Sequence, residues 1–172
     1  ERMQKDKVIV ICGPTASGKT ALSIELAKKI KFVCYAKMKD SSDEEKSERV
    51  KKLNEKFYSA EYYNGYNHKE LANILSNINL GIIPVVWEDN LPQIAIEYVA
   101  HGVPVLASDL GGAHELSKSK DFIFRANDKI DFTQKLKQII ENKELLNDYF
   151  EKSIKLTTME EHMNKLFMYY KQ

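Results

Sequence analysis

The sequence predicts an α/β domain with a doubly wound, Rossmann-like parallel sheet covered by helices on both faces. Short apolar runs alternate with amphipathic segments along the chain. The runs are apolar at successive positions, as expected of strands that are buried on both faces. Polar and glycine-containing segments follow several runs, at the strand ends where open α/β sheets bind ligands. Strands that alternate with helices in this way indicate a parallel sheet.

The expected strands are the apolar runs at 8–12, 32–36, 60–63, 80–86 and 104–107, with a short sixth strand centred on Ile123. Pro84 inside the run 80–86 suggests an irregular strand, because proline donates no ladder hydrogen bond. Two helices are expected in the first third of the chain, and their apolar faces are Leu22, Leu26 and Ile30, and Val50, Leu53 and Phe57.

The remaining helices are also predicted from apolar residues at helical spacing. One follows Asn67, and the next begins with Pro92 in its first turn and ends at His101 and Gly102. Three more have the following apolar positions: Phe132, Leu136, Ile139 and Ile140; Leu145, Leu146, Tyr149 and Phe150; and Met159, Met163, Leu166, Phe167 and Tyr170. We expect the last stripe to pack in the core, or against a domain that this chain lacks.

Length and composition indicate one domain, residues 1–172, since 43% of the residues are hydrophobic and no repeat or linker interrupts them. A net charge of +1 argues against a nucleic-acid-binding surface. Cys12 and Cys34 lie in separate apolar runs, which indicates reduced thiols. No run is long enough to span a membrane and no signal peptide precedes the first strand, so we expect a soluble, cytoplasmic protein.

A phosphate loop is predicted where the first strand meets its helix. Residues 13–20 match G-x-x-x-x-G-K-[ST], and we expect the phosphate-binding residues to be Gly13, Ser17, Gly18, Lys19 and Thr20. Lys19 would neutralise the terminal phosphates of a nucleoside triphosphate, and Thr20 would hold Mg²⁺. The alternative is a glycine-rich turn without a ligand. Residues 7–30 closely resemble the start of bacterial tRNA dimethylallyltransferases, but the aspartate that follows their second strand is missing and nothing downstream is similar. We therefore do not expect prenyl transfer.

A second group of candidate residues lies between Trp87 and Glu115. Its members follow the ends of two strands or lie in the next helix: Glu88, Asp89, Asn90 and Leu91; Glu97; and Gly111 and Gly112. Carboxylates accept hydrogen bonds from vicinal hydroxyls, and glycine N–H groups can approach a diphosphate without obstruction. This chemistry suits a nucleoside diphosphate sugar.

Residues 80–116 also resemble the family 4 retaining glycosyltransferases, which have the GT-B fold. The resemblance rests on Trp87–Pro92, Ile96-Glu97-Tyr98, His101–Val105 and Gly111-Gly112, and the order of elements extends it to residues 31–172 as the donor domain. It implies that Asp89 contacts the donor sugar and Glu97 the ribose, with no cofactor required. Asp89 replaces the usual glutamate and Leu91-Pro92 the usual Phe-Gly, and Glu88 could compensate.

Several of these residues have a purely structural alternative. Glu97 could be a solvated helix residue, and Asp89 a helix cap. His101 and Gly102 are expected to end a helix, and His114 to lie in a surface turn. Gly65 and the segment 66–68 could line the base pocket or serve as a helix cap at Asn67.

The two resemblances meet near Lys31, and this indicates a chimera of two α/β fragments, engineered or natural; a divergent donor domain is the alternative. GT-B enzymes bind the acceptor in a second, N-terminal domain. The expected function is therefore donor binding in an incomplete glycosyltransferase, and whether the chain alone is an enzyme stays open. Two alternatives remain: an ATP- or GTP-binding phosphate-loop protein with Asp109 at the Mg²⁺ ion, or a structural chimera without activity.

Overall fold

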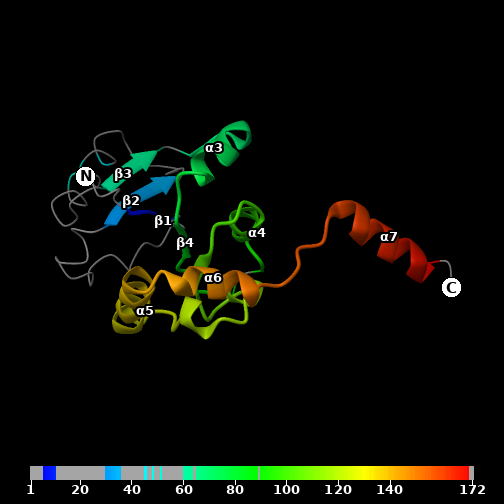
Figure 1. Cartoon of the computed structure of the whole chain (residues 1–172). Coiled ribbons are helices and arrows are strands. Elements are labelled where there is room, and N and C mark those ends of the chain that lie inside the picture. Colours follow the sequence, from blue (N-terminus) through cyan, green and yellow to red (C-terminus); the bar gives the residue numbers. More distant parts are fainter. Residues whose placement is uncertain are drawn as a thin grey trace.

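The computed structural model describes residues 6–10, 30–35, 45, 48, 51, 60–63, 65–88 and 90–170. Within them lies a six-stranded sheet in the order β3-β2-β1-β4-β5-β6, with every pairing parallel. The strands are β1 Asp6–Val10, β2 Ile30–Tyr35, β3 Ala60–Tyr63, β4 Leu80–Ile83, β5 Val105–Ser108 and β6 Ile123–Phe124 (Figure 1). The strand order reverses direction between β1 and β4, which confirms the predicted doubly wound, Rossmann-like fold.

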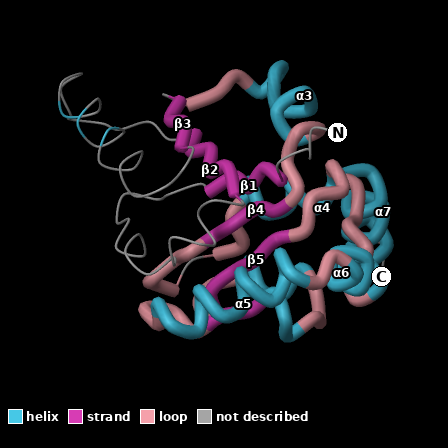
Figure 2. The backbone as a smooth tube through the Cα atoms, turned by 60° about the vertical axis from the view of Figure 1, so that its left-hand side comes forward, coloured by secondary structure: helices cyan, strands magenta, loops and turns pink. Residues whose placement is uncertain are grey.

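Within the described residues, helices follow β3, β4 and β6, and the last three helices come in succession at the end of the chain (Figure 2). They are α3 Leu71–Leu75, α4 Gln93–Ala100, α5 Lys129–Glu141, α6 Glu144–Glu151 and α7 Met159–Tyr170, and the short 3₁₀ turns are η1 His68–Glu70, η2 Ala113–Leu116 and η3 Lys120–Phe122. Asn67 caps η1, since its Oδ1 accepts a hydrogen bond from the Lys69 N–H at 3.1 Å. The predicted helix after Asn67 therefore exists, but as a 3₁₀ turn that continues into a short α-helix.

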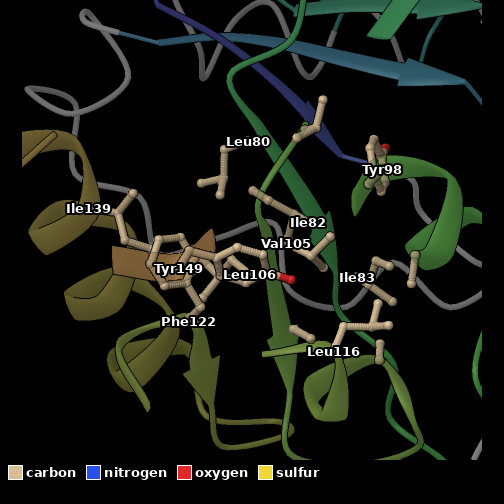
Figure 3. Close-up of a cluster of buried hydrophobic side chains, with 14 of the residues drawn as sticks. Leu80, Ile82, Ile83, Tyr98, Val105, Leu106, Leu116, Phe122, Ile139 and Tyr149 are labelled. Atoms are coloured by element: carbon tan, nitrogen blue, oxygen red, sulfur yellow. The ribbon is translucent and has the colours of Figure 1, made fainter. Parts of the chain in front are cut away.

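The core lies on both faces of β4 and β5, whose residues are all buried. In Figure 3, Ile139 of α5 and Tyr149 of α6 lie on one side of β5, and Tyr98 of α4 lies on the other. Burial on both faces explains why these two strands are apolar at successive positions rather than at alternate ones. Ser108 is the exception, and its buried hydroxyl donates a hydrogen bond to the Val85 carbonyl at 2.7 Å.

Prolines account for small differences from the predicted boundaries. β4 ends at Ile83, before Pro84, rather than continuing to residue 86. β5 begins at Val105, after Pro104, and α4 begins after Pro92, which is its N-cap instead of its first turn. A proline nitrogen carries no hydrogen to donate, so each ring marks a boundary of regular structure. The phosphate loop, residues 19–29 of the helix predicted over 19–30 and Cys12 lie outside the described residues. Ile30, the predicted last residue of that helix, is instead the first residue of β2.

The prediction that the apolar stripe of the last helix, α7, packs in the core is wrong. No residue of α7 is buried, and Met159, Met168 and Tyr170 are 75%, 72% and 85% exposed. Figure 1 shows α7 extending away from the body of the molecule, beyond α6. An amphipathic pattern predicts an apolar face but does not specify what covers that face. None of the described helices has the length and apolar character that crossing a membrane requires.

Candidate functional site

Two of the predicted ligand loops contact each other at the carboxyl edge of the sheet. Glu88, Asn90 and Leu91 follow β4, and Gly111 and Gly112 follow β5. A β-carbon on Gly112 would lie 3.0 Å from both the nitrogen and the Cα of Leu91, so the two backbones are in close contact. Gly111 has a φ of 71°, which favours glycine. The structure thus brings these two groups together, as the sequence predicts, while Asp89 lies outside the described residues.

Glu97 lies on α4, one turn after the helix begins, and its side chain is only 16% exposed. Gln93 Nε2 donates a hydrogen bond to Glu97 Oε1 at 2.8 Å. The hydroxyl of Tyr66, in the loop after β3, also lies near this carboxylate, which raises the pKa of that hydroxyl. His68 Nδ1 lies 3.7 Å from the same Oε1. Glu97 is therefore not the solvated helix residue of the structural alternative, because three side chains surround its carboxylate.

The protonation of Tyr66 follows from these surroundings. Burial and the nearby carboxylate of Glu97 raise the pKa of Tyr66 above its usual value. Both disfavour the tyrosinate form. The Tyr66 hydroxyl consequently keeps its proton at neutral pH.

Four aromatic rings pack against one another next to Glu97. The rings of Tyr35 and Tyr63, paired residues at the ends of β2 and β3, stack at 4.8 Å with an angle of 11°. Tyr66 meets Tyr35 edge-on at 6.2 Å, and His68 meets Tyr66 at 5.8 Å. The predicted cap at Asn67 is confirmed, and the same loop brings Tyr66 beside Glu97. That this loop lines a base pocket stays a prediction.

Sequence reasoning missed Gln93 and Tyr35 as members of this cluster. Gln93 lies four residues before Glu97 on a predicted helix, a spacing that places two side chains on one face. Tyr35 ends an apolar run, like Tyr63. Both signals were present in the sequence, but the pairing of β2 with β3 was needed to join the two tyrosines.

Other predicted positions have structural roles in the described part of the chain. The Asp109 carboxylate accepts a hydrogen bond from the Ala126 N–H at 2.8 Å and so ties the ends of β5 and β6 together. His101 is the C-cap of α4, and Gly102 follows with a φ of 75°, as expected for helix-ending residues. His114 lies half-buried in η2 rather than in an exposed surface turn.

Metal binding finds no support in the described residues. No group of three or more His, Cys, Asp or Glu side chains comes together there as a metal site requires. The predicted phosphate-binding residues (Gly13, Ser17, Gly18, Lys19 and Thr20) lie outside the described part of the chain. Mg²⁺ at Thr20, with Asp109 as a further ligand, therefore stays a prediction.

Comparison with known proteins identifies a family that matches this chain. Residues 18–142 match the family model for glycosyl transferases group 1. The match begins inside the 7–30 unit that the sequence assigns to the phosphate loop. Among curated protein sequences, none is significantly similar to the chain.

Solved structures of GT-B glycosyltransferases share the fold. The catalytic domain of cholesterol-α-glucosyltransferase from Helicobacter pylori matches with a TM-score of 0.61 and 19% identity, over 86% of this chain and 96% of that one. Anabaena HepE in complex with UDP-glucose matches with a TM-score of 0.63 and 13% identity, over 86% of this chain and 42% of that one. A trehalose-6-phosphate structure from E. coli bound with UDP-2-fluoro glucose matches with a TM-score of 0.64 and 16% identity, over 86% of this chain and 38% of that one.

The match to the family model covers most of the chain, and the parallel sheet has the arrangement of these structures. The chain spans well under half the length of HepE and of the E. coli protein. The chain belongs to the glycosyl transferases group 1 family.

Proposed function

We propose that this chain binds a nucleoside diphosphate sugar and serves as the donor half of a glycosyltransferase that transfers a hexose. The observation that carries the proposal is the close approach of Gly112 to Leu91, because it joins two loops at the edge of the sheet where α/β folds bind ligands. HepE was solved with UDP-glucose and the E. coli protein with UDP-2-fluoro glucose, which supports a donor of this class.

Each part of the donor has candidate partners. Glu97 would accept hydrogen bonds from the ribose hydroxyls, as a carboxylate does well. The backbone N–H groups of Gly111 and Gly112 would face the diphosphate, which can approach them closely because glycine has no side chain of its own. The exposed residues Glu88, Asn90 and Leu91 would contact the sugar, together with Asp89. With these roles assigned to protein groups, sugar transfer would need no metal or other cofactor.

Transfer to an acceptor requires a second binding surface. The chain covers 42% of HepE and 38% of the E. coli protein, and we propose that an N-terminal acceptor domain supplies the remainder. Without it the acceptor hydroxyl is not positioned for attack, and the rate advantage of proximity is lost. The exposed apolar side chains of α7 are a candidate contact for that domain. A cytoplasmic location is part of the same proposal.

The phosphate-loop motif at 13–20 supports a second candidate function, which is binding of ATP or GTP with Mg²⁺ at Thr20. In a chimera the motif would have replaced the first strand, loop and helix of the donor domain without binding a ligand. These two possibilities differ in whether Lys19 contributes to any ligand's affinity.

Calorimetric titration tests the proposal with UDP, UDP-glucose and GDP, and with ATP and GTP in the presence of Mg²⁺. Saturable binding of a nucleoside diphosphate sugar should weaken roughly tenfold or more in Glu97→Gln, because hydrogen bonds to a charged group are worth about 1.5–3 kcal/mol. Glu141→Gln, a change of the same type at an exposed position of α5, is the matched control and should bind as the wild type does. Triphosphate binding that is lost in Lys19→Ala, without any response to sugar nucleotides, would replace the donor proposal with the phosphate-loop function.

A further inference from the structure

Glu97 is held from two directions. Gln93, one turn earlier on the same helix, donates to Oε1 at 2.8 Å. Tyr66, in the loop after β3, lies close enough to the same carboxylate for the charge of Glu97 to raise the pKa of its hydroxyl, and His68 of η1 has its Nδ1 3.7 Å from Oε1. These neighbours come from elements that are far apart in the sequence, so together they restrict both the rotation of the Glu97 side chain and its tilt.

These contacts leave hydrogen-bonding capacity on the carboxylate. An ionised carboxylate has about four lone-pair sites, and the hydrogen bond from Gln93 takes one of them. The side chain is 16% exposed, so the rest is not sealed by protein. The acceptor sites that the described neighbours leave on a carboxylate of fixed orientation match the two adjacent hydroxyls of a ribose. Orienting the group before binding also reduces the entropy that the ligand must offset.

We propose that Gln93 and Tyr66 are positioning residues that orient Glu97 toward a ribose diol, and that the site thereby selects ribonucleoside diphosphates over their 2′-deoxy counterparts. The inference rests on the proposed donor binding and adds the determinant of sugar selectivity. A rigid, half-buried acceptor that loses its hydroxyl partner remains unsatisfied, and such sites reject the analogue strongly. A mobile carboxylate would instead turn toward water and discriminate little.

The ratio of two dissociation constants tests the proposal. Calorimetry measures UDP and 2′-deoxy-UDP binding to the whole chain in the wild type, Gln93→Leu and Tyr66→Phe. The wild type should prefer UDP by roughly tenfold or more, the value of one hydrogen bond to a charged group. In both variants the preference should fall to about threefold or less, with UDP affinity reduced and 2′-deoxy-UDP affinity nearly unchanged. A residue that only stabilised the loop would weaken both ligands equally and leave the ratio intact.

Two substitutions elsewhere provide matched controls. Gln138→Leu removes a glutamine on α5 that donates to Asp121 Oδ1 at 3.1 Å, which is the same type of contact at a different place. Tyr63→Phe removes a hydroxyl that donates to Glu61 Oε2 at 3.1 Å within the same aromatic group. Both controls should keep the wild-type ratio. Unfolding in urea establishes that each variant is folded.

The outcomes separate the two proposals. A wild type that binds UDP but does not discriminate against 2′-deoxy-UDP overturns the selectivity inference and leaves donor binding standing. An unchanged ratio in folded Gln93→Leu and Tyr66→Phe overturns the positioning role. A wild type that binds neither UDP nor GDP nor their sugars overturns the donor function, and the inference with it.

Discussion

A β-carbon at position 81 would lie 2.8 Å from Cδ2 of Tyr98, so the backbone of β4 packs directly against the ring of that tyrosine. Tyr98 is fully buried and follows Glu97 on α4. The absence of a side chain at Gly81 therefore sets how closely α4 approaches the sheet, and with it the depth at which Glu97 lies.

Gly81→Ala should destabilise the protein by roughly 1–3 kcal/mol, because an added methyl group in a packed core displaces its neighbours. Strand propensity alone would give the opposite sign, since alanine loses less entropy on folding than glycine. Unfolding in urea measures the effect. In a Tyr98→Leu background the same substitution should cost less, because the ring that it meets is gone. Equal urea midpoints for Gly81→Ala and the wild type would contradict the packing described here.

Gly112→Ala should weaken UDP binding roughly tenfold, because the new methyl group would meet the Leu91 backbone at 3.0 Å and push the two ligand loops apart. Its φ of −86° and ψ of −7° suit any residue, so no backbone strain is added. Calorimetry gives the affinity. Gly102→Ala is the control: it has a φ of 75° and nothing within 4 Å of an added Cβ, so it should lower stability and leave UDP affinity unchanged. If Gly102→Ala lost UDP affinity while Gly112→Ala kept it, the contact between Gly112 and Leu91 would not be what UDP binding requires.

Asp128 should make stability pH-dependent on the acid side. Its Oδ1 accepts hydrogen bonds from the N–H groups of Asp131 and Ile130 at 2.9 and 3.0 Å, which caps α5. The Asp131 hydrogen bond, together with the Arg125 charge and the Ile130 hydrogen bond, lowers the pKa of Asp128 below its ordinary value of 3.8. The contribution is present above that unfolded value and is lost as the pH falls through the lower folded pKa.

Asp128→Asn keeps a capping oxygen but does not titrate in this range. Its urea midpoint should therefore fall less steeply than that of the wild type when the pH is lowered from about 5 to about 2. Asp121→Asn, an exchange of the same kind outside the cap, is a suitable control. Parallel curves for Asp128→Asn and the wild type would show that the cap does not depend on the charge.

Removal of α7 should leave the domain as stable as before. A chain that ends at Thr157 loses no buried residue but keeps Leu156, which packs against the core. We expect the free energy of unfolding to change by less than about 0.5 kcal/mol, as is usual for exposed positions. A chain that ends at Lys155 also loses Leu156 and should be less stable. Equal losses in both truncations would mean that α7 packs on the domain after all.

The sequence by itself determined the elements of this fold and their alternation. Apolar runs at successive positions predicted β4 and β5 because burial on both faces removes the need for polar residues, and Asn67 and Gly102 marked the ends of helical segments through their own backbone preferences. It also predicted that Glu97, Gly111 and Gly112 lie at one edge, because the loops that follow parallel strands all emerge there.

Only the tertiary structure decided which side chains touch at that edge. The pairing of β2 with β3 brings Tyr35 to Tyr63, and the strand order carries Tyr66 to Glu97, more than thirty positions further along the chain. The exposure of α7 was equally beyond prediction, since its periodicity shows an apolar face and not a partner. The physical reason is the same in each case. Local patterns are specified within a few residues of sequence, whereas contacts between elements depend on strand order and on the space that a residue such as Gly81 leaves.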